Sequence, residues 1–170
     1  MFTTYTWLII AAALAVVGLL AMATAKGKGK KCTIEFANVA EGTHCEGVKT
    51  YKTDAAFSSR FLLVKVGSDV DHIDVCGASD IPLGINTDSA AAAEEEVAIA
   101  LFGAAEGTRR VVASAAITLG DMVVAAASGK VKTLPGSAGT YYIIGRAIKA
   151  AAADGDVIEI APTFPIQRVV

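Results

Sequence analysis

Cysteine and histidine side chains are the residues of this chain that could hold a metal ion. Cys32, His44, Cys45, His72 and Cys76 carry thiols and imidazoles, the ligand types that zinc prefers. No C-x-x-C pair is present, and His72 and Cys76 lie four residues apart on one alternating segment. This spacing favours cysteines in strands or in a core, so we predict no metal and no other cofactor.

Hydrolytic or phosphate-binding chemistry would need other motifs. His44 and His72 could each join a serine and an aspartate, because such triads assemble from distant segments. However, the chain has no G-x-S-x-G elbow and no P-loop, and the KGKGKK run of residues 26–31 lacks the Walker spacing. We therefore predict a non-enzymatic protein without catalytic residues.

The charge pattern gives no sign of nucleic-acid binding. The 170 residues include 15 basic and 17 acidic side chains, for a net charge of -2, so no global basic field is expected. The aspartates of residues 69–74 lack the order of an EF-hand loop. The local charge clusters are interpreted as solvated turns and loops: Asp69, Asp71 and Asp74, then Glu94, Glu95 and Glu96, then Arg109 and Arg110.

Most of the chain is predicted to be β-structure. Short apolar or alternating segments are separated by Gly, Asp, Ser and Pro, which is typical of strands joined by tight turns. The expected strands are residues 32–37, 47–52, 60–66, 72–76, 81–86, 97–102, 109–114, 122–125, 130–134, 141–148 and 157–160.

One short helix is expected between these strands. Residues 87–96, TDSAAAAEEE, combine good helix formers with Asp88 or Ser89 as an N-cap. The segment is long enough for one or two turns, although three glutamates at its C-terminal end oppose the helix dipole.

Two segments of the chain resemble each other. Residues 60–103 and 117–162 share an order of strand, turn, strand, turn, glycine-containing strand, Ala-rich acidic turn and strand, at an offset of 60 to 61 residues. Two such units provide about eight short strands, enough for a small β-barrel or a two-sheet sandwich. The sequence leaves both architectures open, and duplication is a hypothesis.

The N-terminus is the most apolar part of the chain. The uncharged run from Trp7 to Ala25 would span roughly 28 Å as a helix, close to the thickness of a bilayer core. A single-pass anchor is the first interpretation. A signal peptide cleaved after Ala23-Thr24-Ala25 and a true start at Met22 are the alternatives. We expect residues 1–31 to form this apolar helix and a basic linker, and residues 32–170 to form the β-rich domain.

Three stretches carry a resemblance to a known family. They are SSRFLLVKVGSD, GASDIPLGINTDSAAAAEEEVAIALFGAAEGT and VASAAITLGDMVVAAASGKVKTLPGSAGTYYIIGRAIKAAAADGDVIEIAP. With them, residues 46–162 resemble the capsid cement (head decoration) proteins of tailed phages, formerly a family of unknown function. The shared motifs are patterns of turns and strands without a catalytic signature.

The resemblance implies a structural protein of the virion. Such proteins bind the outside of an assembled head, so the expected partners are the major capsid protein and further copies of the chain, with a trimer among the expected forms. The apolar run from Trp7 to Ala25 departs from this pattern, because a protein that binds from outside needs no membrane contact. A membrane-anchored small β-domain with an adhesion or scaffolding role is therefore the alternative function.

Overall fold

The structure is a computed structural model and describes residues 47–170. Within this range the protein is mainly β, with ten strands and one short 3-10 helix, η2 (Ala127–Gly129). The prediction of a mainly β fold is confirmed. The expected apolar helix from Trp7 to Ala25, the basic linker and the strand at residues 32–37 lie outside the described residues. Within residues 47–170, no helix is long and apolar enough to cross a bilayer.

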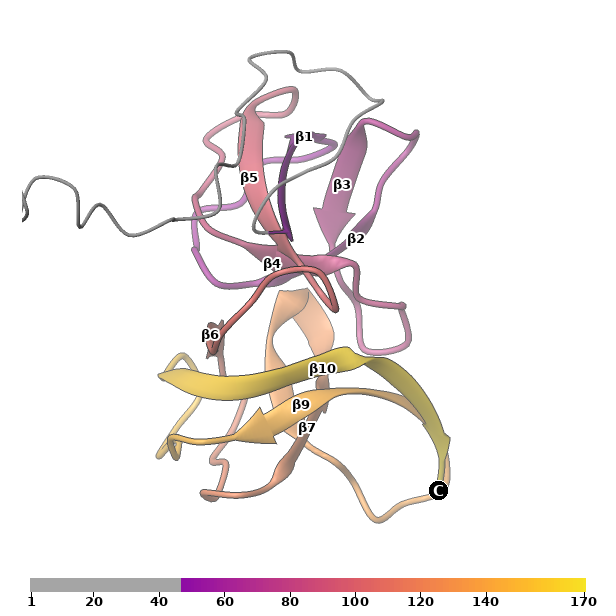
Figure 1. The fold of residues 1–170 in the computed structure, drawn as a ribbon, viewed down its shortest axis with the longest axis vertical. Helices are drawn as coiled ribbons and strands as arrows, with labels where there is room; N and C mark the ends of the chain where they lie inside the picture. The colour runs from indigo at the N-terminus through magenta and orange to yellow at the C-terminus, as the bar shows by residue number, and fades with distance from the viewer. Residues whose placement is uncertain (1–46) are drawn as a thin grey trace, which may run out of the picture. The chain divides into compact units, whose positions relative to one another are not determined.

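The first five strands form a closed barrel in the order β1-β3-β2-β4-β5 (Figure 1). Antiparallel pairing joins all neighbours except β1 and β3, which run parallel and close the barrel through the pairs Lys52↔His72 and Thr53↔Ile73. The strands are β1 (Val48–Thr53), β2 (Leu63–Val66), β3 (His72–Val75), β4 (Gly84–Asn86) and β5 (Glu96–Leu101).

The last five strands form a second sheet in the order β6-β10-β9-β7-β8. All of its strand pairs are antiparallel. A single parallel bridge, Ala113↔Val131, connects the two ends of this sheet. The strands are β6 (Arg109–Val112), β7 (Met122–Ala125), β8 (Val131–Thr133), β9 (Thr140–Ala147) and β10 (Val157–Val169).

The two sheets repeat one order of neighbours. The closed barrel can be followed from β1 in the opposite direction, as β1-β5-β4-β2-β3. If β1 to β5 are matched in turn with β6 to β10, this order becomes β6-β10-β9-β7-β8, which is the order of the second sheet. The isolated bridges Phe57↔Ala90 and Ile117↔Ala151 also correspond, at offsets of 60 and 61 residues. The expected similarity of residues 60–103 and 117–162 agrees with this order, and a duplication origin stays a prediction.

A glycine occupies the same place in both sheets. Gly84 of β4 and Gly145 of β9 lie where a neighbouring strand passes at close range. A Cβ on Gly84 would meet the carbonyl oxygen of Ala100 at 2.5 Å, and a Cβ on Gly145 would press against the carbonyl oxygen of Ala161. Both positions therefore require a residue without a side chain.

Two apolar clusters hold the strands together. One lies among the barrel strands and takes Val112 from β6. The other combines Leu63, Cys76, Ile85 and Phe102 with the inward side chains of the second sheet. Because β7 alternates, Val123 and Ala125 enter this second cluster while Met122 stays exposed. The inward side chains of the second sheet include Val111, Ala113, Ile117, Val123, Ala125, Val131, Ile144, Ala147, Ala151, Ile158 and Ile160.

The predicted helix at residues 87–96 is wrong. Ala90 forms a β-bridge with Phe57 instead, and the Glu95 carboxylate accepts a hydrogen bond from the backbone N–H of Ala91 at 2.7 Å. Glu94 adopts a positive φ of 65°, which a right-handed helix does not allow. Long-range contacts therefore override the local helix propensity of this Ala-rich segment.

Several strand boundaries also differ from the prediction; β4 begins only at Gly84 and β6 ends at Val112, and two further cases have a clear physical reason. The strand expected at residues 60–66 begins only at Leu63, because Phe61 has a positive φ of 65°. The strand expected at residues 157–160 continues to Val169 as the 13-residue β10. Pairing between β10 and β9 is interrupted between Pro162 and Ile166, where proline cannot donate a ladder hydrogen bond.

Candidate functional site

His72 is the centre of a charged cluster at the seam of the barrel. Its Nδ1 lies 2.6 Å from Oδ1 of Asp69, and its Nε2 lies 3.0 Å from Oε1 of Glu94. Lys52 Nζ approaches the other oxygen of Glu94 at 3.2 Å. Because Lys52 and His72 are a register pair of the parallel β1–β3 pairing, this cluster, which we call the seam cluster, links the strands that close the barrel.

The seam cluster stabilises the charged forms of His72, Asp69 and Glu94. Hydrogen bonds to Asp69 and then to Glu94 raise the pKa of His72 above its ordinary value. The hydrogen bond to His72 lowers the pKa of Asp69, and hydrogen bonds from Lys52 and His72 lower the pKa of Glu94. A protonated imidazole donates to both carboxylates at once, which is the arrangement that favours charge on both sides.

This geometry decides against a catalytic triad at His72. Both ring nitrogens face carboxylates, so neither is left to take a proton from a nucleophile. The nearby Ser68 donates its hydroxyl hydrogen to Asp54 at 2.6 Å. The chemistry of His72 is therefore that of a structural ion cluster.

The candidate metal ligands are not brought together where the structure describes them. Cys76 is fully buried in the cluster shared with the second sheet, and burial raises the pKa of its thiol to about 12. The interpretation of Cys76 as a core cysteine is thus confirmed, and its thiol is a poor ligand and nucleophile. Residues 47–170 contain no group of three or more His, Cys, Asp or Glu placed to hold a metal. Cys32, His44 and Cys45 lie outside this range.

Several other charged residues have individual partners, among them Asp74 and Arg110, which the sequence singled out. Lys65 lies between Asp80 and Asp74, at 2.9 and 3.9 Å. The Arg110 guanidinium lies 5.9 Å from the centre of the Phe61 ring, and the Arg60 guanidinium approaches the same ring at 5.8 Å. These contacts anchor the chain where the barrel ends and β6 begins.

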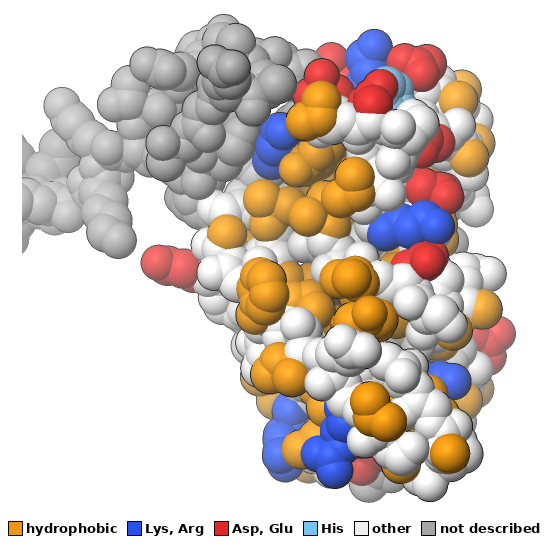
Figure 2. All heavy atoms as spheres, turned by 90° about the vertical axis from the view of Figure 1, so that its right-hand side faces the viewer, with side chains coloured by type: hydrophobic (Ala, Val, Ile, Leu, Met, Phe, Trp, Pro, Cys, Tyr) orange, Lys and Arg blue, Asp and Glu red, His pale blue; other side chains and the backbone are white. Residues whose placement is uncertain are grey.

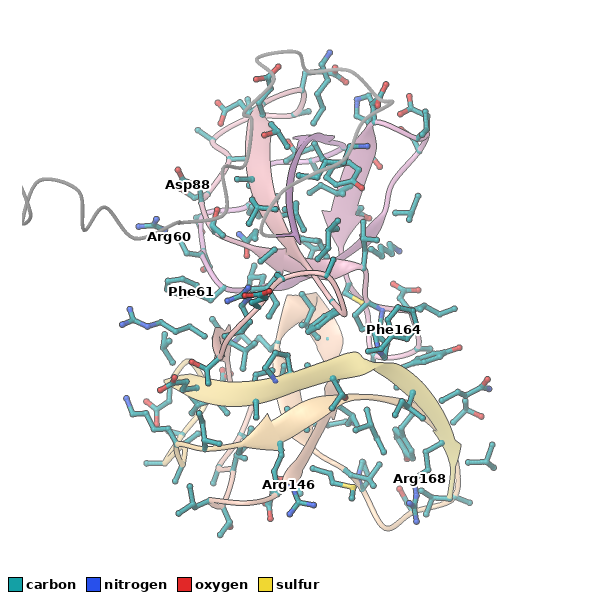
Figure 3. All side chains as sticks on the ribbon, in the orientation of Figure 1. Arg60, Phe61, Asp88, Arg146, Phe164 and Arg168 are labelled. Atoms are coloured by element: carbon teal, nitrogen blue, oxygen red, sulfur yellow. The ribbon has the colours of Figure 1, made fainter. Side chains whose placement is uncertain are left out.

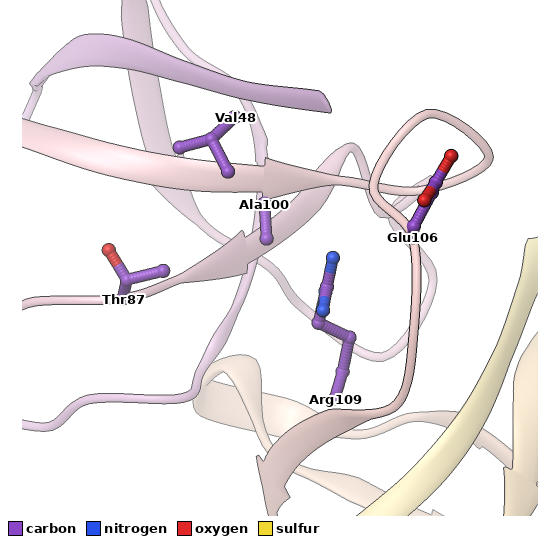
Figure 4. A pocket seen from close by; sticks show the side chains of 5 residues that line it. All are labelled: Val48, Thr87, Ala100, Glu106 and Arg109. Carbon is purple, nitrogen blue, oxygen red and sulfur yellow. The ribbon is translucent and has the colours of Figure 1, made fainter. Parts of the chain in front are cut away.

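A shallow pocket of about 380 Å³ lies beside β5 and β6 (Figure 4). Its lining combines the apolar side chains of Val48 and Ala100 with Thr87, Glu106 and Arg109. The Thr87 hydroxyl already donates to the carbonyl of Ala98 at 2.9 Å, and Arg109 donates to the carbonyl of Thr108 at 3.0 Å. Two of the polar groups that could fix a ligand, on Thr87 and Arg109, are thus engaged within the chain.

The second sheet exposes a face of different character, which we call the outer face. Direct strand pairing places Lys132 beside Val124, Val124 beside Ile143, and Ile143 beside Ile166. The same rule adds Tyr141 with Arg168, and Met122 with Arg146, because directly paired residues point to the same side of a sheet. In Figure 3, Arg146 and Arg168 lie on the side of the sheet away from the barrel. The outer face comprises Met122, Lys132, Tyr141, Ile143, Arg146, Ile166 and Arg168, and Val124 lies fully buried among them.

Several large apolar side chains of β10 are exposed. Phe164 is 70% exposed, Ile166 56% and Val169 73%. On the face in view, Figure 2 shows hydrophobic side chains over both the barrel and the second sheet, with a group of acidic side chains at the outer end of the barrel. Exposed apolar groups in such numbers mark a surface for association.

Comparison with known proteins places this geometry in a family. The family whose description is phage cement protein matches residues 62–162. The chain belongs to the phage cement protein family. The match runs from the barrel into β10, so strands of both sheets belong to the family's common region. The resemblance indicated by the sequence is confirmed, and this cement protein is a phage structural protein.

A solved structure supports the fold of this cement protein. The N base of head fiber gp8.5 in bacteriophage phi29 is similar, with a TM-score of 0.52 and 16% sequence identity. The superposition covers 69% of this chain and 94% of that chain. At this identity the likeness concerns the fold alone. No curated protein matches the chain.

Proposed function

We propose that this protein binds the outside of an assembled phage head and stabilises it, with the major capsid protein as its partner. The observation that supports the proposal is the family match over residues 62–162. The family is described as phage cement protein, and the word cement denotes a protein that holds other subunits together. The virion surface is accordingly the proposed location.

The described surfaces support an adhesive role. The seam cluster engages both nitrogens of His72, and burial holds Cys76 in its unreactive form. In contrast, β10 exposes Phe164, Ile166 and Val169. Polar groups are therefore used within the fold, while apolar surface is available for a partner.

The mechanism follows from mass action. A protein that binds the assembled shell but not its separated subunits stabilises the assembled state. At a free concentration of about 100 times Kd, each occupied site adds about 2.7 kcal/mol, and this gain is multiplied by the number of sites on the lattice. We further propose that copies of the chain associate with one another, because linked copies bind a lattice with higher avidity.

Cosedimentation with heads tests this proposal. The full-length chain is mixed with assembled heads that lack it and, as a control, with unassembled capsid protein. We expect saturable binding to heads at about micromolar concentration or below, no binding to the unassembled protein, and a higher melting temperature of the heads. Absence of binding to heads at these concentrations would contradict the proposed function.

A further inference from the structure

We infer that the outer face of the second sheet is the surface that contacts the head, and that it fits a shell surface bearing carboxylate and apolar side chains. This inference rests on the proposed function and assigns it to a defined part of the molecule. Three observations support it: the distribution of charge along the chain, the ion-pair partners of the cations, and the residue types of the outer face.

Charge is divided unevenly along the chain. Residues 47–102, which contain the barrel, carry nine Asp and Glu against four Lys and Arg, whereas residues 103–170 carry five against seven. Strands β7, β8 and β9 contain no acidic residue, and the only one in β10 is Glu159. The outer face therefore presents Lys132, Arg146 and Arg168 with no carboxylate among its residues.

The cations of the two sheets differ in their partners. In the barrel, Lys52, Arg60 and Lys65 each pair with a carboxylate of the same domain. The three cations of the outer face make no ion pair with any residue of the range 47–170. Arg146 donates to the carbonyl of Gly120 at 3.1 Å, and Lys132 Nζ lies 5.8 Å from the centre of the Tyr141 ring. Their charge is thus available to an acidic partner.

The composition of the outer face is that of an interface. Tyr, Met and Arg are enriched at the centres of protein interfaces, where Asp and Glu are depleted. Tyr141, Met122, Arg146 and Arg168 belong to the enriched types, and Ile166 adds exposed apolar surface. A nucleic acid would engage the cations but would leave this apolar surface without a partner, so a protein surface fits the face better.

A two-stranded extension borders this face. Thr140–Tyr142 pair with Gln167–Val169, and β7 contacts β9 only as far as Ile143. Among the described residues this part of the ribbon has no third strand. An isolated pair of strands is marginally stable in water, so contact with the shell would stabilise the ribbon as well as bury Ile166.

Charge reversal on the outer face tests the inference. The double variant Arg146→Glu/Arg168→Glu is compared with Lys49→Glu/Lys149→Glu, a matched control that changes the net charge equally but lies off the outer face. Binding of each full-length protein to assembled heads is measured by cosedimentation at several salt concentrations. We expect the outer-face variant to lose more than about tenfold in affinity, and the control to stay within about threefold of the wild type.

Circular dichroism, thermal unfolding and light scattering of the free proteins accompany these measurements. All four substituted side chains are at least partly exposed, so the fold should be unchanged. If wild type, control and outer-face variant bind heads equally, the inference is wrong and the proposed function stands. If the wild type does not bind, both are wrong. If the outer-face variant loses self-association in the free protein, this face holds a second copy, which overturns the assignment to the shell.

Discussion

The barrel and the second sheet arrange five strands in the same order of neighbours, yet they end differently. The barrel closes through two parallel residue pairs, reinforced by the seam cluster around His72. In the second sheet only the bridge Ala113↔Val131 connects the corresponding ends. Ala113 and Gly155 lie at the positions, 61 residues later, that Lys52 and Glu94 occupy in the barrel.

One order of neighbouring strands thus carries two different surfaces. Three of the four cations of the barrel, Lys52, Arg60 and Lys65, pair with carboxylates of the barrel, and Lys49 lies over the ring of Tyr51. Within residues 103–170, the second sheet lacks a seam cluster but contains the long strand β10, with Phe164 and Val169 exposed. The two halves therefore differ mainly in the pairing of their charges and in the length of their last strand, since the barrel also exposes apolar side chains such as Val66 and Val70.

Substitution of the paired glycines tests the equivalence of the two halves and should have the largest effect. In Gly84→Ala and Gly145→Ala, the new Cβ would meet a backbone carbonyl of the neighbouring strand, which can yield only by moving that strand. We expect each variant to lose about 2–3 kcal/mol in the free energy of unfolding measured by urea denaturation. Gly136→Ala, with open space around it, is the control. Unchanged stability in either glycine variant would argue against the close strand approach.

Substitution of Asn86 tests a difference between the barrel and the second sheet, namely a buried amide that only the barrel has at this position. This buried amide accepts from the N–H of Leu62 and donates to the carbonyls of Ser59 and Asp88, at 2.9 and 2.7 Å. The corresponding residue of β9 is Ala147. Asn86→Ala would leave these backbone groups without partners, so we expect a loss of about 2 kcal/mol in unfolding free energy. The exposed Gln167→Ala should change it by less than about 0.5 kcal/mol; equal effects of both variants would refute the role of Asn86.

Removal of the seam cluster should have the smallest effect on the stability of the fold, and the size of this effect should depend on pH. The folded state raises the pKa of His72, so it binds this proton more tightly than the unfolded chain does. The resulting stability is complete below the ordinary pKa of 6.5 and is lost as pH rises through the raised pKa. Asp69 and Glu94 have lowered pKa values, so their contribution is lost on acidification instead.

The difference in melting temperature between wild type and His72→Gln measures this contribution. We expect the difference to be largest between about pH 5 and 6.5 and to shrink toward pH 8.5. Lys49→Gln, a cation of β1 outside the seam cluster, should show no such pH profile. A difference that is constant over this pH range would mean that His72 acts by packing and not by its charge.

The sequence predicted a strand correctly where the residues of the segment itself and its flanking turn residues determine the conformation. The segment from Met122 to Ala125 was expected as a strand and is one, because a short apolar run between turn residues is a local signal. The end of β10 could not be predicted in the same way. Pro162 and Pro165 suggest an end to pairing, whereas the chain passes them in a bulge and pairs again from Ile166.

Candidate surfaces were harder to predict from the sequence than the strands. Asp69 is near His72 in the sequence, but Glu94 is 22 residues away and reaches it only because the barrel closes. The outer face depends on the register of β7, β8, β9 and β10, which periodicity alone does not fix. Apart from Glu159 of β10, these strands contain no acidic residue; this composition was visible in the sequence and would have been the signal for this face.

An electron cryo-microscopy reconstruction of heads saturated with the full-length protein tests the central claim most directly. We predict density for the protein on the outside of the shell, with Arg146 and Arg168 of the outer face against the capsid protein. The barrel with its seam cluster should face the solvent. A reconstruction in which the barrel contacts the shell and the outer face is exposed, or in which no bound protein is present, would contradict this account.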